Sequence, residues 1–162
     1  MAPFWFALAL LAAQNPQVWI FVRTDCPIAN RYAPTIERLT QMYGKQGVDF
    51  LLVYPEPGAT PASVEQHRKA YGLTAPYALD PKQERVRNAG IQVTPEVAVY
   101  SREGRLLYRG RIDDRQASLG VARQAASRHD LAEILDAIVA GRTPAFRETK
   151  AFGCAIEAAA NR

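Results

Sequence analysis

The residue with the clearest capacity for chemistry is Cys26, in the stretch FVRTDCPIANRY. It directly follows a continuous apolar run and directly precedes Pro27, a residue suited to the first turn of a helix. The N-terminus of a helix favours a thiolate, the nucleophilic form of cysteine, because its unpaired N–H groups and the helix dipole stabilise negative charge. Arg23 and Arg31 would add to this effect, whereas Asp25 would oppose it. The sequence therefore predicts a reactive thiol at Cys26, and the alternative is a buried, inert one.

The second cysteine is far away in the sequence. The position three residues after Cys26 is Ala29, so the disulfide cycle of a C-x-x-C motif is impossible. Cys154, in the stretch KAFGCAIE, follows the last strong helical pattern, and a thiol there can fold back over the sheet edge. By attacking an oxidised or mixed-disulfide Cys26 it would resolve that intermediate. The alternative is that Cys154 packs as a small apolar residue beside Phe152 and Ile156.

Composition limits the other classes of function. The net charge of +4 comes from 20 basic and 16 acidic residues, and the basic ones are spread along the chain, so nucleic acid is not an expected partner. Two cysteines are too few for a disulfide-stapled scaffold, and neither has the neighbours of a zinc site. We expect no metal and no cofactor.

The N-terminal residues 1–16 are signal-like. Within them PFWFALALLAA is uncharged and apolar and ends in small residues, but it is too short for a membrane span and lacks a preceding Lys or Arg. We expect a periplasmic or otherwise exported protein without stable membrane insertion. The alternative is a cytoplasmic protein whose first segment packs on the domain. The absence of a cysteine after the apolar run argues against a bacterial lipoprotein anchor.

The remaining chain predicts one α/β domain over residues 17–141, followed by a tail over 142–162 that carries Cys154. A buried strand at 18–22, a helix from Pro27 to Gly44 or Gly47 kinked at Pro34, and a strand at 48–54 form a βαβ unit with parallel strands.

Further elements follow the βαβ unit. A helix begins at Thr60-Pro61, and a short one is closed by Gly90. EVAVYS and RLLYRGRI then form an antiparallel hairpin around Gly104, with Arg105, Arg109 and Arg111 on one strand face that we expect to be solvated. A last helix is expected within 118–141, with a stripe of Leu and Ile residues and a stop at Gly141. This order predicts a mixed sheet with helices on both faces.

The stretch QVTPEV places Pro95 at the entrance to a strand, after the β-branched Thr94, where a cis peptide bond would fit. Together with FVRTDCPIANRYAP, VTPEVAVYSREGRLLYRGRIDD and the order of strands and helices, it makes residues 17–141 resemble the thioredoxin-like superfamily. More narrowly, the chain resembles the redoxin branch grouped with alkyl hydroperoxide reductase and thiol-specific antioxidant proteins. The resemblance implies a thioredoxin-like fold in which Pro95 is cis and faces the active cysteine. It also implies that Thr94 offers backbone groups to a bound substrate chain.

Three functions remain open at this point. The first is a thiol–disulfide oxidoreductase with Cys26 as nucleophile, Cys154 as resolving thiol and a protein thiol or disulfide as substrate. The second is a thiol peroxidase that reduces hydroperoxides, although Thr24 stands two residues before Cys26 where peroxiredoxins have a threonine three before. The third is a redox-inactive binding module on the same scaffold. Thr24, Thr94 and Pro95 are the expected substrate-binding residues, and the electron donor is not identifiable from the sequence.

Other polar residues receive ordinary structural interpretations. His67 is expected on the surface of a helix, and His129 is expected to be solvated or to cap a helix. Asp113 and Asp114 follow the hairpin and are expected to cap the following helix in preference to binding a cation.

Overall fold

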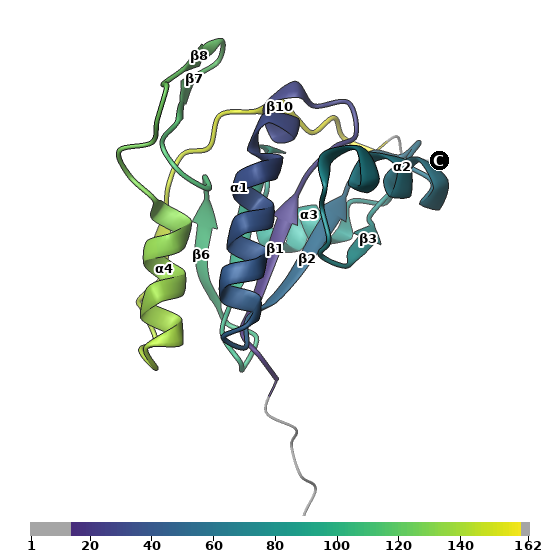
Figure 1. Cartoon of the computed structure of the whole chain (residues 1–162). Helices are drawn as coiled ribbons and strands as arrows, with labels where there is room; N and C mark the ends of the chain where they lie inside the picture. The colour runs from purple at the N-terminus through teal and green to yellow at the C-terminus, as the bar shows by residue number, and fades with distance from the viewer. Residues whose placement is uncertain (1–13, 160–162) are drawn as a thin grey trace, which may run out of the picture.

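The computed structural model describes residues 14–159, and its central element is a six-stranded sheet (Figure 1). In spatial order its strands are β3 (Tyr77–Leu79), β2 (Asp49–Tyr54), β1 (Gln17–Phe21), β5 (Glu96–Tyr100), β6 (Leu106–Gly110) and β9 (Arg147–Glu148). The pairs β1–β2, β2–β3 and β6–β9 are parallel, whereas β1–β5 and β5–β6 are antiparallel. The predicted mixed sheet, with parallel strands joined to an antiparallel hairpin, is confirmed.

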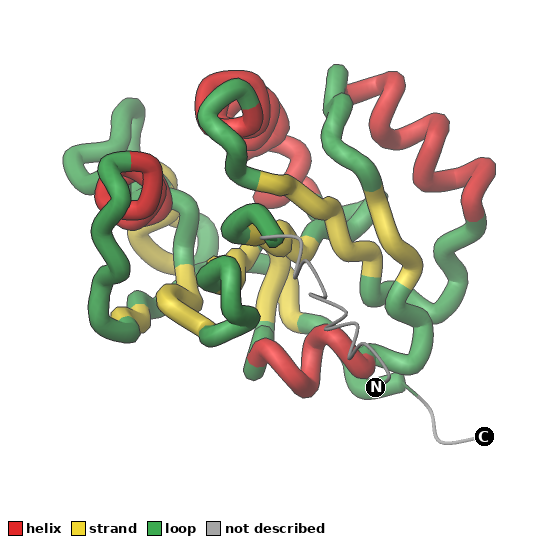
Figure 2. The backbone as a smooth tube through the Cα atoms, turned by 90° about the horizontal axis from the view of Figure 1, so that it is seen from below, coloured by secondary structure: helices red, strands yellow, loops and turns green. Residues whose placement is uncertain are grey.

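Helices cover both faces of this sheet. α1 (Pro27–Gly44), α2 (Pro61–Tyr71) and α4 (Asp130–Val139) lie on one face, and α3 (Glu84–Ala89) lies on the other (Figures 1 and 2). The uninterrupted apolar sequence of β1 fits its central position, because a strand covered on both faces needs apolar residues on both. The fold is therefore α/β and thioredoxin-like, as predicted.

The alternating side chains of β1 divide the core into two clusters. Val18 and Ile20 point toward the face of α1, where Ile36 belongs to the same cluster. Phe21 points to the opposite face and packs in a second cluster with Val86 of α3. β1 is thus held from both sides, which fixes the position at which the chain leaves the strand and enters the loop before Cys26.

α1 begins and ends where its sequence predicts. Cys26 is its N-cap residue, Pro27 occupies the first turn, and Pro34 lies inside the helix. Its buried stripe includes Tyr32, Ile36 and Leu39, which recur at spacings of three and four residues. The stripe orients α1 on the sheet and so fixes the direction of its N-terminus.

The last helix is shorter than its predicted region. α4 begins only at Asp130, and the chain before it forms a small hairpin of β7 (Gln116–Ser118) and β8 (Val121–Ala122) that projects from the body in Figure 1. Gly120, with a φ of 76°, permits the turn of this hairpin. The apolar stripe that supported a helix occurs only after residue 130, so the expectation that helix extends back toward residue 118 is wrong.

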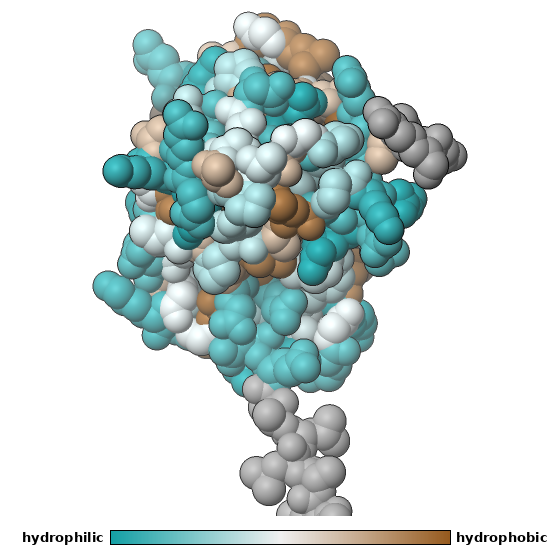
Figure 3. All heavy atoms as spheres, turned by 90° about the vertical axis from the view of Figure 1, so that its right-hand side faces the viewer, coloured by the Kyte–Doolittle hydropathy of each residue, from teal (hydrophilic) through white to brown (hydrophobic). Residues whose placement is uncertain are grey.

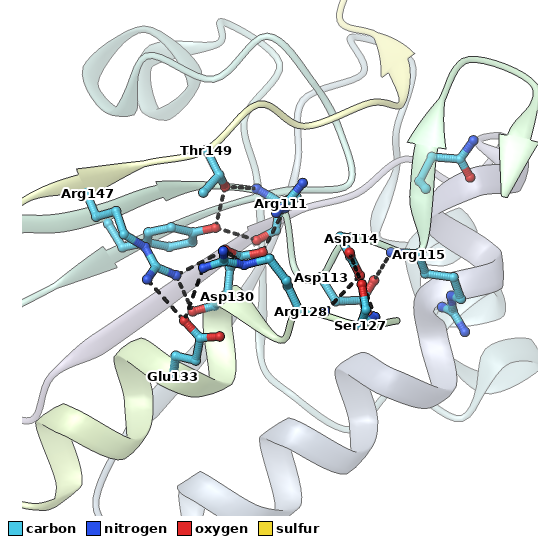
Figure 4. Close-up of polar contacts among 12 residues, drawn as sticks. Arg111, Asp113, Asp114, Arg115, Ser127, Arg128, Asp130, Glu133, Arg147 and Thr149 are labelled. Carbon is cyan, nitrogen blue, oxygen red and sulfur yellow. Dashed lines mark hydrogen bonds and ion pairs between the residues drawn. The ribbon is translucent and has the colours of Figure 1, made fainter. Parts of the chain in front are cut away.

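Asp113 and Asp114 do not cap α4, in contrast to the prediction. Asp114 accepts hydrogen bonds from the backbone N–H groups of Ser127 and Arg128, at 2.7 and 3.0 Å, and Asp113 accepts one from Tyr32 Oη at 2.6 Å. These hydrogen bonds hold the base of the β7–β8 hairpin on the domain. Burial of the Tyr32 hydroxyl raises its pKa to about 12. Figure 4 shows the Asp114 carboxylate turned toward Ser127, in the loop that precedes α4, and the Asp113 carboxylate turned toward Arg115.

The arginines in β6 and directly beside it do not form the freely solvated face that was predicted. Arg105 is exposed, but Arg109 pairs with Glu148 of β9 at 2.9 Å, and Arg111 pairs with the buried Asp130 at 2.7 Å. The prediction failed because the partners come from distant segments, β9 of the C-terminal tail for Arg109 and α4 for Arg111, which local periodicity does not reveal.

Residues 142–159 of the predicted tail pack on the domain. β9 joins the sheet edge, and Arg147 binds Asp130 at 3.1 Å and Glu133 at 3.1 Å (Figure 4). Thr149 then shares a hydrogen bond of 2.6 Å with the hydroxyl of Tyr108. The chain is therefore anchored at Thr149, five residues before Cys154, and from there it continues to Val93–Thr94, with which Cys154 and Ala155 pair.

The surface on the side of α2 and β3 is mostly hydrophilic, with small separate hydrophobic areas (Figure 3). No helix in the described part of the chain has the length and apolar character needed to cross a membrane. Most of the signal-like segment 1–16 lies outside the described residues, which begin at residue 14.

Candidate functional site

The structure joins Cys26 and Cys154 by a disulfide bond across 128 residues of sequence, with a Cα–Cα distance of 6.0 Å. Cys26 is 1% exposed, whereas Cys154 is only partly buried. The partner that is missing at Ala29 is thus supplied by the C-terminal segment. The alternative in which Cys154 merely packs as an apolar residue does not describe this state of the protein.

The sulfur of Cys26 lies at the N-terminus of α1, as predicted. It accepts a hydrogen bond from the backbone N–H of Ala29 at 3.3 Å, so Ala29 contributes an amide where a C-x-x-C protein has its second thiol. The carbonyl oxygen of Thr94 lies 3.2 Å from the same sulfur. Because a disulfide sulfur carries no hydrogen, this second contact becomes a hydrogen bond only when Cys26 is a thiol. The N–H of Ala29 therefore favours the thiolate form of Cys26, whereas the carbonyl of Thr94 favours the thiol form.

The loop that faces Cys26 contains the cis peptide bond Thr94–Pro95. β4 (Val93–Thr94) precedes it and pairs antiparallel with β10 (Cys154–Ala155), with Cys154 opposite Thr94. The structure thus brings Thr94 and Pro95 to the disulfide. The buried carboxylate of Glu96 accepts hydrogen bonds from the N–H groups of Gln92 and Val93, at 2.9 and 3.2 Å, and so fixes the backbone at the start of β4. Burial raises the pKa of Glu96.

The segment that carries Cys154, residues 151–159, is called the C-terminal strap below. Gly153 lies so close to the loop that a Cβ atom there would be 2.7 Å from the carbonyl carbon of Thr94 and closer still to its oxygen. The N–H of Ile156 donates to the carbonyl of Gln92 at 3.0 Å. Farther along, the side-chain amide of Gln83 donates to the carbonyl of Glu157 at 2.6 Å. The strap is therefore held mainly through its backbone.

Arg23 contacts the C-terminal strap. One of its guanidinium nitrogens donates to the carbonyl of Ala155 at 3.1 Å, and another pairs with Asp25 at 3.0 Å. Arg31 is exposed. Arg23 therefore helps to hold the C-terminal strap, and its stabilisation of a Cys26 anion stays a prediction.

Thr24 contributes its backbone to the site. Its N–H donates to Glu56 Oε1 at 2.9 Å, and its carbonyl accepts from the side-chain amide of Asn30 at 3.3 Å. Glu56 was not predicted as a site residue, and its second oxygen is buried without a hydrogen-bond partner among residues 14–159. Its position gave a usable signal, because it follows β2 at the same edge at which β1 leads to Cys26.

His67 is buried at 6% exposure, so the prediction of a surface histidine is wrong. Its Nδ1 lies 2.9 Å from the hydroxyl of Tyr54, and its Nε2 lies 2.7 Å from the side-chain oxygen of Asn30. Asn30 in turn holds the carbonyl of Thr24, which makes His67 part of a polar chain that ends two residues from Cys26. Burial lowers the pKa of His67, and the neutral ring suits these partners, with Nε2–H donating to Asn30.

Metal ligation is not supported in the part of the chain that the structure covers. No group of three or more His, Cys, Asp or Glu side chains in residues 14–159 is placed to hold an ion. His129 lies at the start of α4 and makes no side-chain cap bond.

Comparisons with solved structures agree with this fold. An uncharacterised protein from Sinorhizobium meliloti 1021 is 25% identical, with a TM-score of 0.77 over 92% of this chain and 82% of that one. A conserved protein from Geobacillus kaustophilus is 22% identical, with a TM-score of 0.76 over 89% and 77%. A secreted disulfide oxidoreductase of Mycobacterium tuberculosis, homologous to E. coli DsbE, is 18% identical, with a TM-score of 0.54 over 79% and 82%. The last two show likeness of fold alone.

No protein with curated functional information matches the chain. The model of the Redoxin family matches residues 6–125, which include Cys26 and Pro95 and end before Cys154. The C-terminal strap is thus an addition to the region that the family model describes. With most of its length matched by that model and its cysteine and proline loop in contact, the chain belongs to the Redoxin family.

Proposed function

We propose that this redoxin is a thiol–disulfide oxidoreductase in which Cys26 is the nucleophile and Cys154 the resolving thiol. The observation that carries the proposal is the disulfide between these residues at the N-terminus of α1, against the Thr94–Pro95 loop. A two-cysteine cycle needs both sulfurs to reach bonding distance, and the C-terminal strap provides this without a C-x-x-C motif.

The forward reaction begins with both cysteines reduced. The Cys26 thiolate attacks one sulfur of a disulfide in a protein substrate, and the other substrate sulfur leaves as a thiolate that takes up a proton. Cys154, after losing its proton, then attacks the sulfur of Cys26 and releases the substrate as a second thiol. The substrate disulfide gains two electrons, and the pair Cys26 and Cys154 loses two.

Regeneration requires an external dithiol as reductant. Because Cys26 is 1% exposed and Cys154 only partly buried, the incoming thiolate attacks the sulfur of Cys154. Cys26 is then the leaving group, and the Ala29 N–H and the end of α1 stabilise the departing thiolate. A stabilised leaving thiolate speeds thiol–disulfide exchange. The donor's second thiol finally releases Cys154.

The remaining predicted residues have distinct roles in this proposal. Thr94 and Pro95 border the sulfur of Cys26 and form the wall against which a substrate chain lies. Thr24 contributes through its backbone, which Glu56 and Asn30 hold on both sides. We further propose export as the setting of this chemistry, on the strength of the signal-like residues 1–16, since disulfides persist outside the cytoplasm. Sequencing the N-terminus of protein recovered from the exported fraction tests this point.

The test exposes reduced protein to a protein disulfide and, in a separate arm, to a hydroperoxide, and follows the thiols by mass spectrometry. The proposal predicts that the protein disulfide oxidises the wild type to the Cys26–Cys154 form, and that Cys26→Ser abolishes the reaction. If only the hydroperoxide oxidises Cys26, the protein is a thiol peroxidase that acts through a sulfenic acid. If neither does, and Cys26→Ser still captures a partner, the chain is a binding module.

A further inference from the structure

We propose that the C-terminal strap is an internal copy of a substrate segment, and that the edge of β4 to which it binds selects substrates in which glycine precedes the reactive cysteine. This inference rests on the proposed function and adds the class of substrate sequence. It concerns the edge of β4, the backbone of Gly153 and the side chains on either side of Cys154.

The strap is bound as an extended chain is bound to an open strand edge. β10 is the only strand paired with β4 in the described structure, and the two lie antiparallel with Cys154 opposite Thr94. A further bond from the Ile156 N–H to the Gln92 carbonyl, 3.0 Å long, extends the pairing by main-chain atoms. The hydrogen bonds of this pairing come from main-chain atoms, so an extended chain of another sequence can form them once the strap leaves, provided that its side chains fit.

Selectivity arises one residue before the cysteine. A Cβ at Gly153 would lie 2.7 Å from the carbonyl carbon of Thr94 and 3.3 Å from the backbone nitrogen of Pro95. These are backbone atoms between β4 and β5, and Thr94 itself is fully buried, so the loop has little room to retreat. Any side chain at this position would push the bound chain away from β4.

The residues after the cysteine have different requirements. Ala155 is exposed, so the position directly after the cysteine tolerates any side chain. Ile156 is partly buried and packs on the core cluster of Phe21 and Val86, so the second position favours an apolar residue. The β4 edge and the cluster beside it therefore fit the pattern Gly-Cys-any-apolar.

Strap and substrate exclude each other because both need the same edge and the same sulfur. In the disulfide form Cys26 is covered and β4 is paired, so only reduced protein with a displaced strap accepts a substrate chain. After the first exchange, a substrate held by one disulfide bond must move off β4 before Cys154 returns to resolve it.

The test uses full-length Cys154→Ser protein, reduced, with synthetic peptides spanning residues 150–157. Each peptide carries its cysteine as a mixed disulfide with thionitrobenzoate. When the Cys26 thiolate attacks the peptide sulfur, a protein–peptide disulfide forms, the peptide–thionitrobenzoate bond breaks, and the coloured thiolate leaves. We expect the peptide with the Gly153→Ala change to react roughly tenfold more slowly than the parent, as for the loss of one or two main-chain hydrogen bonds.

Two further peptides serve as controls for the pattern. The Ala155→Leu peptide should react within about twofold of the parent, and the Ile156→Asp peptide should react several-fold more slowly. The strap of the variant competes equally with all peptides, so ratios of rates are unaffected. Equal rates for the parent and Gly153→Ala peptides would overturn the selectivity. The small reagent dithiobis-nitrobenzoate separates failure of this inference from failure of the proposed function. If it does not modify Cys26, the thiol is unreactive and the proposed function is refuted as well. If it modifies Cys26 but the two peptides react at equal rates, only this inference is refuted.

Discussion

Replacing Gly153 by alanine in the whole protein should make the Cys26–Cys154 disulfide easier to reduce. The added Cβ would meet the Thr94 carbonyl group, so the strap must shift away from β4 before the two sulfurs can bond. The thiols themselves and the environment of α1 are unchanged by this substitution. Any change in the disulfide equilibrium therefore measures how much docking of the strap contributes.

The magnitude follows from the contacts that are lost. They are the short β10–β4 pairing and the bond between Ile156 N–H and the Gln92 carbonyl. About two main-chain hydrogen bonds, at a net ~0.5–1.5 kcal/mol each, give roughly 1–3 kcal/mol. That corresponds to about a 5- to 150-fold lower effective concentration of Cys154 at Cys26, and to a reduction potential raised by roughly 20–60 mV.

The assay equilibrates wild type and variants in glutathione buffers of graded potential and quantifies the oxidised fraction by mass spectrometry after acid quenching. Ala155→Ser is the matched control, because it changes an exposed side chain on the same short strand. We expect the control to titrate with the wild type and Gly153→Ala at a higher potential. Superimposable curves for Gly153→Ala and the wild type would refute the steric reasoning about the strap.

Three further outcomes follow from other contacts. Cys154→Ser should lower the free energy of unfolding in urea by up to about 5 kcal/mol under oxidising conditions, because the disulfide closes a loop of 128 residues. In reductant, where the disulfide is absent from both proteins, the loss should be small. Equal losses in both conditions would contradict this. Asp130→Ala should lower the free energy of unfolding by roughly 2–3 kcal/mol in the same assay, because Arg111 and Arg147 lose their shared buried partner. A loss below about 0.5 kcal/mol would show that these two ion pairs are dispensable. Because the pKa of His67 is lowered in the folded protein, the unfolded chain binds a proton at this residue more readily than the folded chain does. The stability that the neutral ring contributes is therefore present above pH ~6.5 and is lost as the pH falls toward the pKa of the folded state. His67→Gln should flatten that decline between pH 7.5 and 5, and an unchanged slope would refute the assignment.

Local sequence patterns were sufficient for the central fold. The continuous apolar run of β1, the three- and four-residue spacing of Tyr32, Ile36 and Leu39, and the turn at Gly104 each reflect the geometry of one element. Such signals need no knowledge of distant residues. They place the N-terminus of α1, and with it Cys26, correctly.

What the sequence did not reveal depends on contacts between distant segments. The burial of His67 requires α2 to face Asn30 of α1, and the pairing of Arg111 requires Asp130 at the start of another helix. The docking of Cys154 depends on two paired residues of β10 and on the absence of a Cβ at Gly153. A two-residue strand has no periodicity to detect, so the route of the tail could be proposed but not its register against Thr94.

The most direct test of the central claim is the order in which disulfides form at Cys26. Reduced wild type and Cys154→Ser protein are mixed with one equivalent of a protein disulfide, quenched with acid at successive times, and mapped by non-reducing mass spectrometry. We predict a mixed disulfide at Cys26 in both proteins, which persists in Cys154→Ser and gives way to the Cys26–Cys154 bond in the wild type. A mixed disulfide that persists equally in both proteins, or that forms first on Cys154, would contradict the roles assigned to the two cysteines.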